Sequence, residues 1–195
     1  MGEQVVELGG RTATVTALAV RPGAAAYYNL TVSTLHTYVV GGSHVVVHNC
    51  NEEAQADLAR MRAKLGMSTP EQEKIDVANK IPGAKNNTLG RMDFDGGRDS
   101  IYGQNGRLPR PYAYPGKGFG IAPQSFEDHA EGDMVSQAMS KGYTGGNAII
   151  YTDRATCSFC SNSMAGYARL LNLDTLTVYD PYGLVGVWDQ NGLVP

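Results

Sequence analysis

Four residues in the C-terminal half of the chain have the types and spacing that zinc chemistry requires. The stretch "DHAEGDMVS", residues 128–136, places His129 and Glu131 two apart at the start of an expected helix. The stretch "ATCSFCSNS" places Cys157 and Cys160 at the start of another. A C-x-x-C at a helix start puts both sulfurs on one face, where a single ion can bind them. One imidazole and two thiolates leave the fourth position of a tetrahedral zinc site open for water.

Each pair alone has a plainer interpretation. A lone C-x-x-C is also typical of a redox pair or of two buried thiols. Acidic residues are common at helix starts because the helix dipole favours them, so His129 and Glu131 alone indicate little. The combination is more specific: H-A-E opens one helix, 25 residues that contain one strand follow, and C-S-F-C opens the next helix.

This combination resembles the H-x-E and P-C-x-x-C signature of the zinc-dependent nucleobase deaminases, the cytidine deaminase-like superfamily. The resemblance implies that His129, Cys157 and Cys160 bind Zn²⁺. It also implies that Glu131 is not a ligand but moves protons between water, the ring nitrogen and the departing ammonia. Thr156 stands where the general motif has proline, and we expect its hydroxyl to cap the helix.

Two elements narrow the resemblance further. "TCSFC" and "HAEG" are similar to elements of bacterial toxin deaminases that resemble the DddA-like double-stranded-DNA cytosine deaminases, and the match covers roughly residues 86–195. This resemblance implies an α/β fold: a cytidine deaminase-like three-layer fold with a mixed central sheet, preceded by a short all-β segment.

The segment before the helix expected at 128–140 carries residues that suit a nucleic-acid substrate. Residues 107–119 interleave cationic and aromatic side chains, namely Arg107, Arg110, Tyr112, Tyr114, Lys117 and Phe119. Cations beside aromatic stacking surfaces are typical of single-strand or flipped-base recognition. A proline-stiffened loop whose tyrosines pack on the sheet accounts for the same residues. By family position, Phe126 and the backbone N–H of Ala130 are further candidate substrate contacts.

Strand and helix signals alternate around these residues. Short strands are expected at "RMDF" and "DSIYG", and beyond residue 126 a helix at 128–140, a strand "NAIIYT", a helix at about 157–171, and strands "TLTVYD" and "LVGVW". Helices that alternate with short buried strands predict an α/β layer fold with one mixed sheet.

A change of pattern near residue 50 divides the chain. Before it, alternation in segments such as "TATVTALAV" and "SHVVVHN" predicts strands. After it, "NEEAQADLARMRAKLG" and "STPEQEKIDVANKIPG" predict two helices, the second capped by Ser68 or Thr69 and stopped at Pro82-Gly83. We therefore expect an all-β segment at 1–49, a helical linker at 50–84 and the deaminase domain at 85–195.

The last part of the all-β segment suggests a processing site. "YYNLTVSTLHTYVVGGSHVVVHNC" resembles the C-terminal end of a Hint domain, the intein-like self-cleaving fold. The resemblance implies that Asn49 cyclises onto its own carbonyl with the help of His48, and that the peptide bond before Cys50 breaks. The N-terminal half of a Hint domain is missing from this sequence. We therefore expect the chain to be the tail of a longer polymorphic toxin.

Several features of the sequence argue against other classes of protein, namely membrane proteins, redox modules and structural zinc modules. No apolar run approaches the roughly 18 residues that a membrane span requires, and no secretory signal is visible. A redox module leaves His129 and Glu131 without a role. A structural zinc site fills all four positions with protein ligands, and no fourth Cys or His follows residue 50.

The expected function is zinc-dependent conversion of cytosine to uracil in single- or double-stranded DNA. The expected partners are DNA and a cognate immunity protein, with no membrane, and the expected setting is a secreted interbacterial effector that acts in the cytoplasm of the target cell. The alternatives are deamination of RNA, adenine or free nucleosides, and a non-catalytic zinc or redox module.

Overall fold

The computed structural model describes residues 51–95 and 98–194 in full, together with the backbone of Cys50 and of four short strands before it. The chain forms two compact units, Met1–Glu53 and Ala54–Pro195. Among the described helices, none is both long and apolar enough to cross a bilayer.

The described backbone of the first unit is extended. β1 (Gln4–Val6) pairs with β2 (Thr12–Thr14), and β3 (Thr37–Val40) pairs with β4 (Val45–His48), all antiparallel. Valine and threonine favour such strands. β2 and β4 lie within the segments "TATVTALAV" and "SHVVVHN", where strands were expected. The assignment to a Hint domain stays a prediction.

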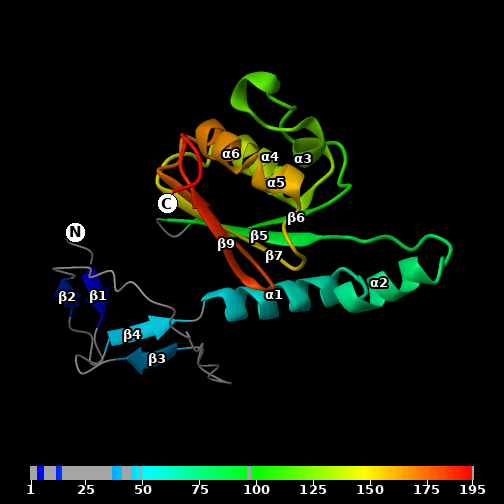
Figure 1. Cartoon of the computed structure of the whole chain (residues 1–195), viewed down its shortest axis with the longest axis horizontal. Helices are drawn as coiled ribbons and strands as arrows, with labels where there is room; N and C mark the ends of the chain where they lie inside the picture. Colours follow the sequence, from blue (N-terminus) through cyan, green and yellow to red (C-terminus); the bar gives the residue numbers. More distant parts are fainter. Residues whose placement is uncertain are drawn as a thin grey trace, which may run out of the picture. The chain divides into compact units, whose positions relative to one another are not determined.

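The second unit is built on a five-stranded mixed sheet with the strand order β6-β5-β7-β8-β9 (Figure 1). The strands are β5 (Leu89–Phe94), β6 (Ile101–Gln104), β7 (Asn147–Thr152), β8 (Thr175–Asp180) and β9 (Gly183–Trp188). β7 and β8 are parallel and the other neighbours are antiparallel. The expectation of an α/β fold with one mixed sheet is confirmed. A parallel pair needs a long crossover connection, and here the crossover carries both cysteines of the C-x-x-C.

The helices of this unit are α1 (Cys50–Lys64), α2 (Pro70–Ala78), the 3₁₀ turn η1 (Lys117–Phe119), α3 (Pro123–Glu127), α4 (Ala130–Ser140), α5 (Ser158–Ser161) and α6 (Met164–Leu170). They cover both faces of the sheet (Figure 1). Ala54 and Leu58 of α1 pack with Tyr151 of β7 on one face. Met134 of α4 packs in the larger cluster with Ile150 of β7 on the other. Successive strand residues point to opposite faces, so β7 joins the two clusters.

Most of α1 and the whole of α2 lie within the second unit. Residues 54–84 belong to the same compact unit as the sheet. Thr69 is the N-cap of α2 and its side chain accepts a hydrogen bond from the Gln72 N–H at 3.2 Å. The helix ends at Ala78, before Pro82, because Asn79 closes the last turn and Lys80 adopts a φ of 55°.

The helix expected at about 157–171 is divided into α5 and α6, with Asn162 and Ser163 between them. The Ser163 hydroxyl donates to the Phe159 carbonyl at 2.8 Å and accepts from the Ala122 N–H at 3.1 Å. Serine side chains that bond nearby backbone groups compete with helical hydrogen bonds. The Ser163 N–H bonds to the Cys160 carbonyl in a tighter turn, and the next helix begins at Met164.

Candidate metal and catalytic site

His129 is placed by the start of α4. It is the N-cap of this helix, with an extended backbone (φ −94°, ψ 157°), and its side chain makes no capping hydrogen bond. An N-cap side chain usually bonds the first turn of its own helix. The imidazole instead faces the two cysteines, with Nδ1 at 3.1 Å from Cys160 Sγ and 3.4 Å from Cys157 Sγ.

The two cysteines are placed by the start of α5. Cys157 is the N-cap, and its sulfur accepts a hydrogen bond from the Cys160 N–H at 3.4 Å. This corrects the expectation that Thr156 caps the helix, because the Thr156 hydroxyl oxygen is buried without a hydrogen-bond partner among the described residues. The chain therefore uses the first cysteine itself to begin the helix.

The ligand atoms of His129, Cys157 and Cys160 all lie within 4.8 Å of one another, and this group can hold a metal ion. In a tetrahedral zinc site with ordinary Zn–S and Zn–N bonds, adjacent sulfur and nitrogen ligands are about 3.6 Å apart. The separations from Nδ1 to the two sulfurs, 3.1 and 3.4 Å, are close to this value. The donor set and its spacing therefore fit Zn²⁺ with three protein ligands.

Glu131 lies in the first turn of α4 and is only 3% exposed. It lines a cavity of about 250 Å³ together with His129, Cys157, Asn86, Thr88, Asn105 and Ala155. Burial raises the pKa of the Glu131 carboxyl, and the nearby Cys160 and His129 act in the opposite direction. A buried carboxyl group thus faces the same cavity as two of the three metal ligands.

Cys160 is fully buried, and a short hydrogen-bond chain reaches its sulfur. The Ser125 hydroxyl lies 3.6 Å from Cys160 Sγ and 2.6 Å from the Tyr167 hydroxyl. Burial raises the pKa of the Cys160 thiol, with Glu131 adding to the effect, whereas the hydrogen bond from Ser125 lowers it. The Ser125 hydroxyl therefore donates to this sulfur, and Tyr167 holds Ser125 in place through its own hydrogen bond to that hydroxyl.

Arg110 does not face solvent as a phosphate-binding group would. Its side chain is 5% exposed and lies 2.9 Å from Asp133, which is fully buried. Its guanidinium also donates to the carbonyls of Glu127 at 2.9 Å and His129 at 3.0 Å. These hydrogen bonds hold the backbone on either side of Asp128 and at His129, and a contact of Arg110 with substrate stays a prediction.

Phe126 is buried and Tyr114 is partly buried, and their roles as substrate contacts stay predictions. Phe126 is completely buried, and the Tyr114 ring lies 5.9 Å from it while the Tyr114 hydroxyl bonds the Ile121 carbonyl. Ala130 is also fully buried, so only its backbone remains a candidate contact. Tyr112, by contrast, is 37% exposed. The tyrosine that packs in the core is therefore Tyr114, and Tyr112 keeps its candidate role.

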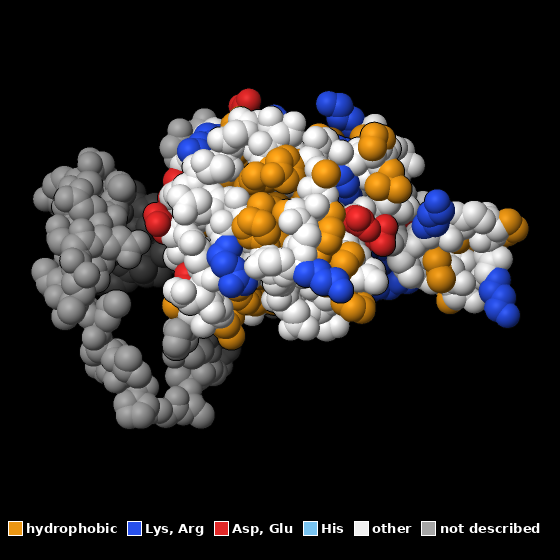
Figure 2. Space-filling view, turned by 90° about the horizontal axis from the view of Figure 1, so that it is seen from above, with side chains coloured by type: hydrophobic (Ala, Val, Ile, Leu, Met, Phe, Trp, Pro, Cys, Tyr) orange, Lys and Arg blue, Asp and Glu red, His pale blue; other side chains and the backbone are white. Residues whose placement is uncertain are grey.

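One exposed aromatic residue lies inside the cysteine motif. Phe159 is 53% exposed, and its ring lies 6.5 Å from the His129 ring in an edge-on arrangement. The face of the second unit covered by α3 to α6 carries other hydrophobic side chains with Lys and Arg side chains between them (Figure 2). Such a mixture suits a partner that has both apolar rings and negative charge.

Three polar residues that line the cavity were not predicted as site residues: Asn86, Thr88 and Asn105. Asn105 links the other two, since its Oδ1 accepts from the Thr88 N–H at 2.8 Å and its Nδ2 donates to the Asn86 carbonyl at 3.1 Å. The available signal is weak: Thr88 directly precedes β5, and Asn105 directly follows β6. These strands are antiparallel neighbours, so the two residues meet at one end of the sheet.

The expected processing residues lie at the border of the described chain. Asn49 lies outside the described residues, and only the backbone is described for His48 at the end of β4 and Cys50 at the start of α1. Their autoprocessing role stays a prediction.

Comparison of the chain with protein-family models, with curated proteins and with solved structures finds no match.

Proposed function

We propose that the second unit is a zinc-dependent hydrolytic deaminase that converts cytosine to uracil in DNA. The observation that carries the proposal is the convergence of His129, Cys157 and Cys160 on one point, with Glu131 buried in the same cavity. Three protein ligands beside a cavity are typical of a catalytic zinc site, whereas a structural site has four.

The residues then divide into two roles. His129, Cys157 and Cys160 would hold Zn²⁺, which supplies a water molecule whose pKa is lowered toward neutrality. The Glu131 carboxylate would take one proton from the water and deliver it to the ring nitrogen N3 of cytosine as the hydroxide adds to C4. Glu131 would then pass the remaining proton of that hydroxyl group to the amino group, so that the C4–N bond breaks and ammonia leaves. The oxygen of water thus replaces the amino group at C4, and the net reaction needs no redox partner.

The architecture supports this assignment. A mixed sheet with helices on both faces, and with the two ligand-bearing helix starts on one side of it, agrees with the cytidine deaminase-like three-layer fold that the motifs suggest. The alternative of a non-catalytic zinc or redox module gives no purpose to a buried Glu131 that lines a cavity.

DNA is the substrate that we favour, because the exposed groups suit a nucleotide chain. Arg107 is 42% exposed, and Lys117, Tyr112 and Phe159 are also exposed. Cations of this kind neutralise phosphates, and exposed rings provide stacking surfaces. RNA, adenine and free nucleosides remain alternative substrates, and the test distinguishes them.

The test is to incubate the purified full chain with single-stranded DNA, double-stranded DNA, RNA and free nucleosides, followed by sequencing or mass measurement of the products. We expect cytosine-to-uracil conversion in DNA by the wild type. Glu131→Ala should lower the rate by about 10²- to 10⁴-fold, because general acid–base catalysis is lost, and should keep its zinc. Near-parental turnover in Glu131→Ala refutes the proton-transfer role, and inactivity of the wild type on DNA refutes the substrate assignment.

We further propose a biological setting for this activity: a secreted toxin that acts in the cytoplasm of a target bacterium and is neutralised in the producer by an immunity protein. An enzyme that edits genomic DNA endangers its own producer, so a cognate inhibitor is required. Expression of the chain alone should be toxic and should raise the frequency of cytosine mutations. Harmless expression of zinc-loaded protein would argue against this setting.

A further inference from the structure

Asn87 lies between two residues, Asn86 and Thr88, that line the candidate active-site cavity. Both the N–H and the carbonyl of Asn87 form hydrogen bonds with side chains that do not line this cavity. The Asn87 N–H donates to Glu73 Oε2 at 2.8 Å, and the Asn87 carbonyl accepts from Arg62 Nη1 at 3.0 Å and from Arg154 Nε at 2.9 Å. A segment that lines the cavity is thus held by side chains remote from it in sequence.

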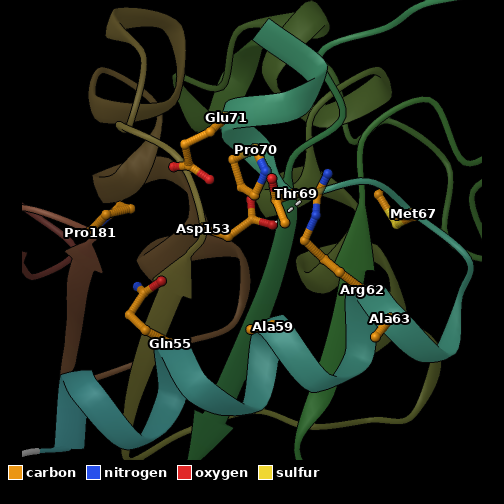
Figure 3. A pocket seen from close by; sticks show the side chains of 10 residues that line it. All are labelled: Gln55, Ala59, Arg62, Ala63, Met67, Thr69, Pro70, Glu71, Asp153 and Pro181. Atoms are coloured by element: carbon orange, nitrogen blue, oxygen red, sulfur yellow. Dashed lines mark hydrogen bonds and ion pairs between the residues drawn. The ribbon is translucent and has the colours of Figure 1, made fainter. Parts of the chain in front are cut away.

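These side chains belong to one buried network of charges. Arg62 lies 2.7 Å from Glu73 and 2.6 Å from Asp153, and Arg154 lies 2.6 Å from Glu73. Arg62, Glu73 and Asp153 are only 3%, 6% and 8% exposed. Figure 3 shows Arg62 reaching from α1 toward Asp153, beside the start of α2. Arg62 and Asp153 also line a separate cavity of about 260 Å³ on this side.

Stability alone does not account for four charges at this place. Apolar residues of similar volume often stabilise a protein as well as a buried ion pair does, because desolvation offsets the Coulomb attraction. Apolar residues cannot, however, bond backbone groups in fixed directions. Glu73 and the two arginines do so at Asn87, and Asp153 Oδ1 accepts from the Leu89 N–H at 2.9 Å.

The other side of the same segment is bonded by Asn105, which accepts from the Thr88 N–H and donates to the Asn86 carbonyl. Residues 86–88 are therefore held from two sides, by the charge network at Asn87 and by Asn105 at its neighbours. These hydrogen bonds hold the two cavity-lining residues although the segment precedes β5 and lies outside the sheet.

We propose that Glu73 and Arg154 are positioning residues for the substrate: they fix the backbone of Asn87 and so hold Asn86 and Thr88 against the nucleobase. The inference rests on the deaminase function proposed above. In this proposal α1 and α2 help to shape the active site, because they carry Arg62 and Glu73. A misplacement of about 1 Å in a positioned group can cost roughly 10²-fold in rate.

The test uses Glu73→Gln in the full chain, with Glu71→Gln as the matched control. Both residues are on α2, but Glu71 is exposed. For a cytosine-containing oligonucleotide, we expect Glu73→Gln to raise KM at least ~10-fold with a smaller change in kcat, because it weakens substrate binding. Its zinc content should be unchanged, and Glu71→Gln should match the wild type. A folded, zinc-loaded Glu73→Gln with wild-type KM overturns the proposal.

Amide hydrogen exchange provides a readout that does not need activity. The N–H groups of Asn87 and Thr88 should exchange at least ~10-fold faster in Glu73→Gln than in the wild type, whereas those of α4 should not change. If the wild type deaminates no nucleic acid, the proposed function fails, and unchanged exchange at Asn87 then overturns the positioning role as well. If Glu73→Gln does not fold, Arg154→Lys takes the same measurements, since it keeps the charge but loses the planar fork that bonds two partners.

Discussion

Asp133 binds two arginines that the sequence alone does not distinguish. Arg107 is 42% exposed and lies 3.3 Å from Asp133, whereas Arg110 is 5% exposed and lies 2.9 Å from it. Arg110 in addition bonds the carbonyl of His129. Arg107 is therefore a surface group, whereas Arg110 is an interior group that supports the backbone at His129.

We predict that Arg110→Ala lowers the free energy of unfolding by about 3–5 kcal/mol, because it leaves the buried Asp133 without its main partner. Arg107→Ala should cost only about 0–1 kcal/mol, as is usual for an exposed ion pair. Denaturant unfolding of both zinc-saturated variants measures the difference. Equal losses would contradict the assignment of Arg110 to the interior.

The grouping of His129, Cys157 and Cys160 leads to a second prediction at the residue scale. We expect about one zinc per chain in the wild type and loss of zinc in Cys157→Ser, because a serine hydroxyl does not replace a thiolate ligand of zinc. Thr156→Ala changes the adjacent residue, whose hydroxyl oxygen has no partner among the described residues, and should keep its zinc. Metal analysis of the purified proteins decides, and an unchanged zinc content in Cys157→Ser would disprove the ligand assignment.

The sequence singles out four residues, His129, Glu131, Cys157 and Cys160, because the two pairs occur together and their combination resembles a known signature, whereas each pair alone indicates little. The surrounding residues could not be selected in this way. Phe126 is a core residue because α3 lies against α4, and Asn105 reaches the cavity because β6 pairs with β5. Both facts depend on packing between elements, which residue type does not reveal.

At the scale of elements, Gly132 explains how α4 approaches α3 so closely. A Cβ added at Gly132 would lie inside van der Waals contact of the Ser125 carbonyl and the Phe126 backbone. Because neighbouring Glu131 and His129 belong to the site, the close approach of these helices also fixes the first turn of α4. The glycine in "HAEG" is therefore required by packing.

We predict that Gly132→Ala destabilises the protein by about 1–3 kcal/mol through overpacking, although alanine in a helix is usually favoured over glycine by about 1 kcal/mol. Gly118→Ala is the control, because a Cβ at Gly118 meets nothing within 4 Å. Thermal unfolding of the two variants should show a loss for Gly132→Ala alone. A stabilised Gly132→Ala would show that α3 moves away at no cost.

β8 was predictable from the sequence because its buried residues alternate with less buried ones along the strand. The division between α5 and α6 was not, because the same apolar spacing continues through it. What divides the helix is the Ser163 hydroxyl, whose bond to Ala122 joins residues 41 positions apart. Such a partner is visible only once α3 is in place.

At the scale of the whole molecule, the packing of residues 54–84 is another feature that the local sequence does not reveal. Their helices were predictable, but not their attachment to the sheet. That attachment depends on pairs such as Arg62 with Asp153, which are 91 positions apart. The local pattern of α1, with charged residues on most of its surface, favours an exposed helix equally well. The boundary between the two compact units accordingly falls at Glu53, and not after the second helix.

The position of this boundary leads to the last prediction. Cleavage between Asn49 and Cys50, as the resemblance to a Hint domain implies, would cut the chain a few residues before Ala54, where the second unit begins. The released fragment would keep Ala54 and Leu58 and hence the whole cluster that joins α1 to the sheet. We therefore expect processing at this bond to yield a folded fragment that begins with Cys50 and binds zinc as the uncleaved protein does. Intact-mass measurement of the product gives the site of cleavage, and Asn49→Ala should abolish cleavage while leaving the zinc content unchanged. A product that begins at another residue, or continued cleavage of Asn49→Ala, would exclude the asparagine-dependent route.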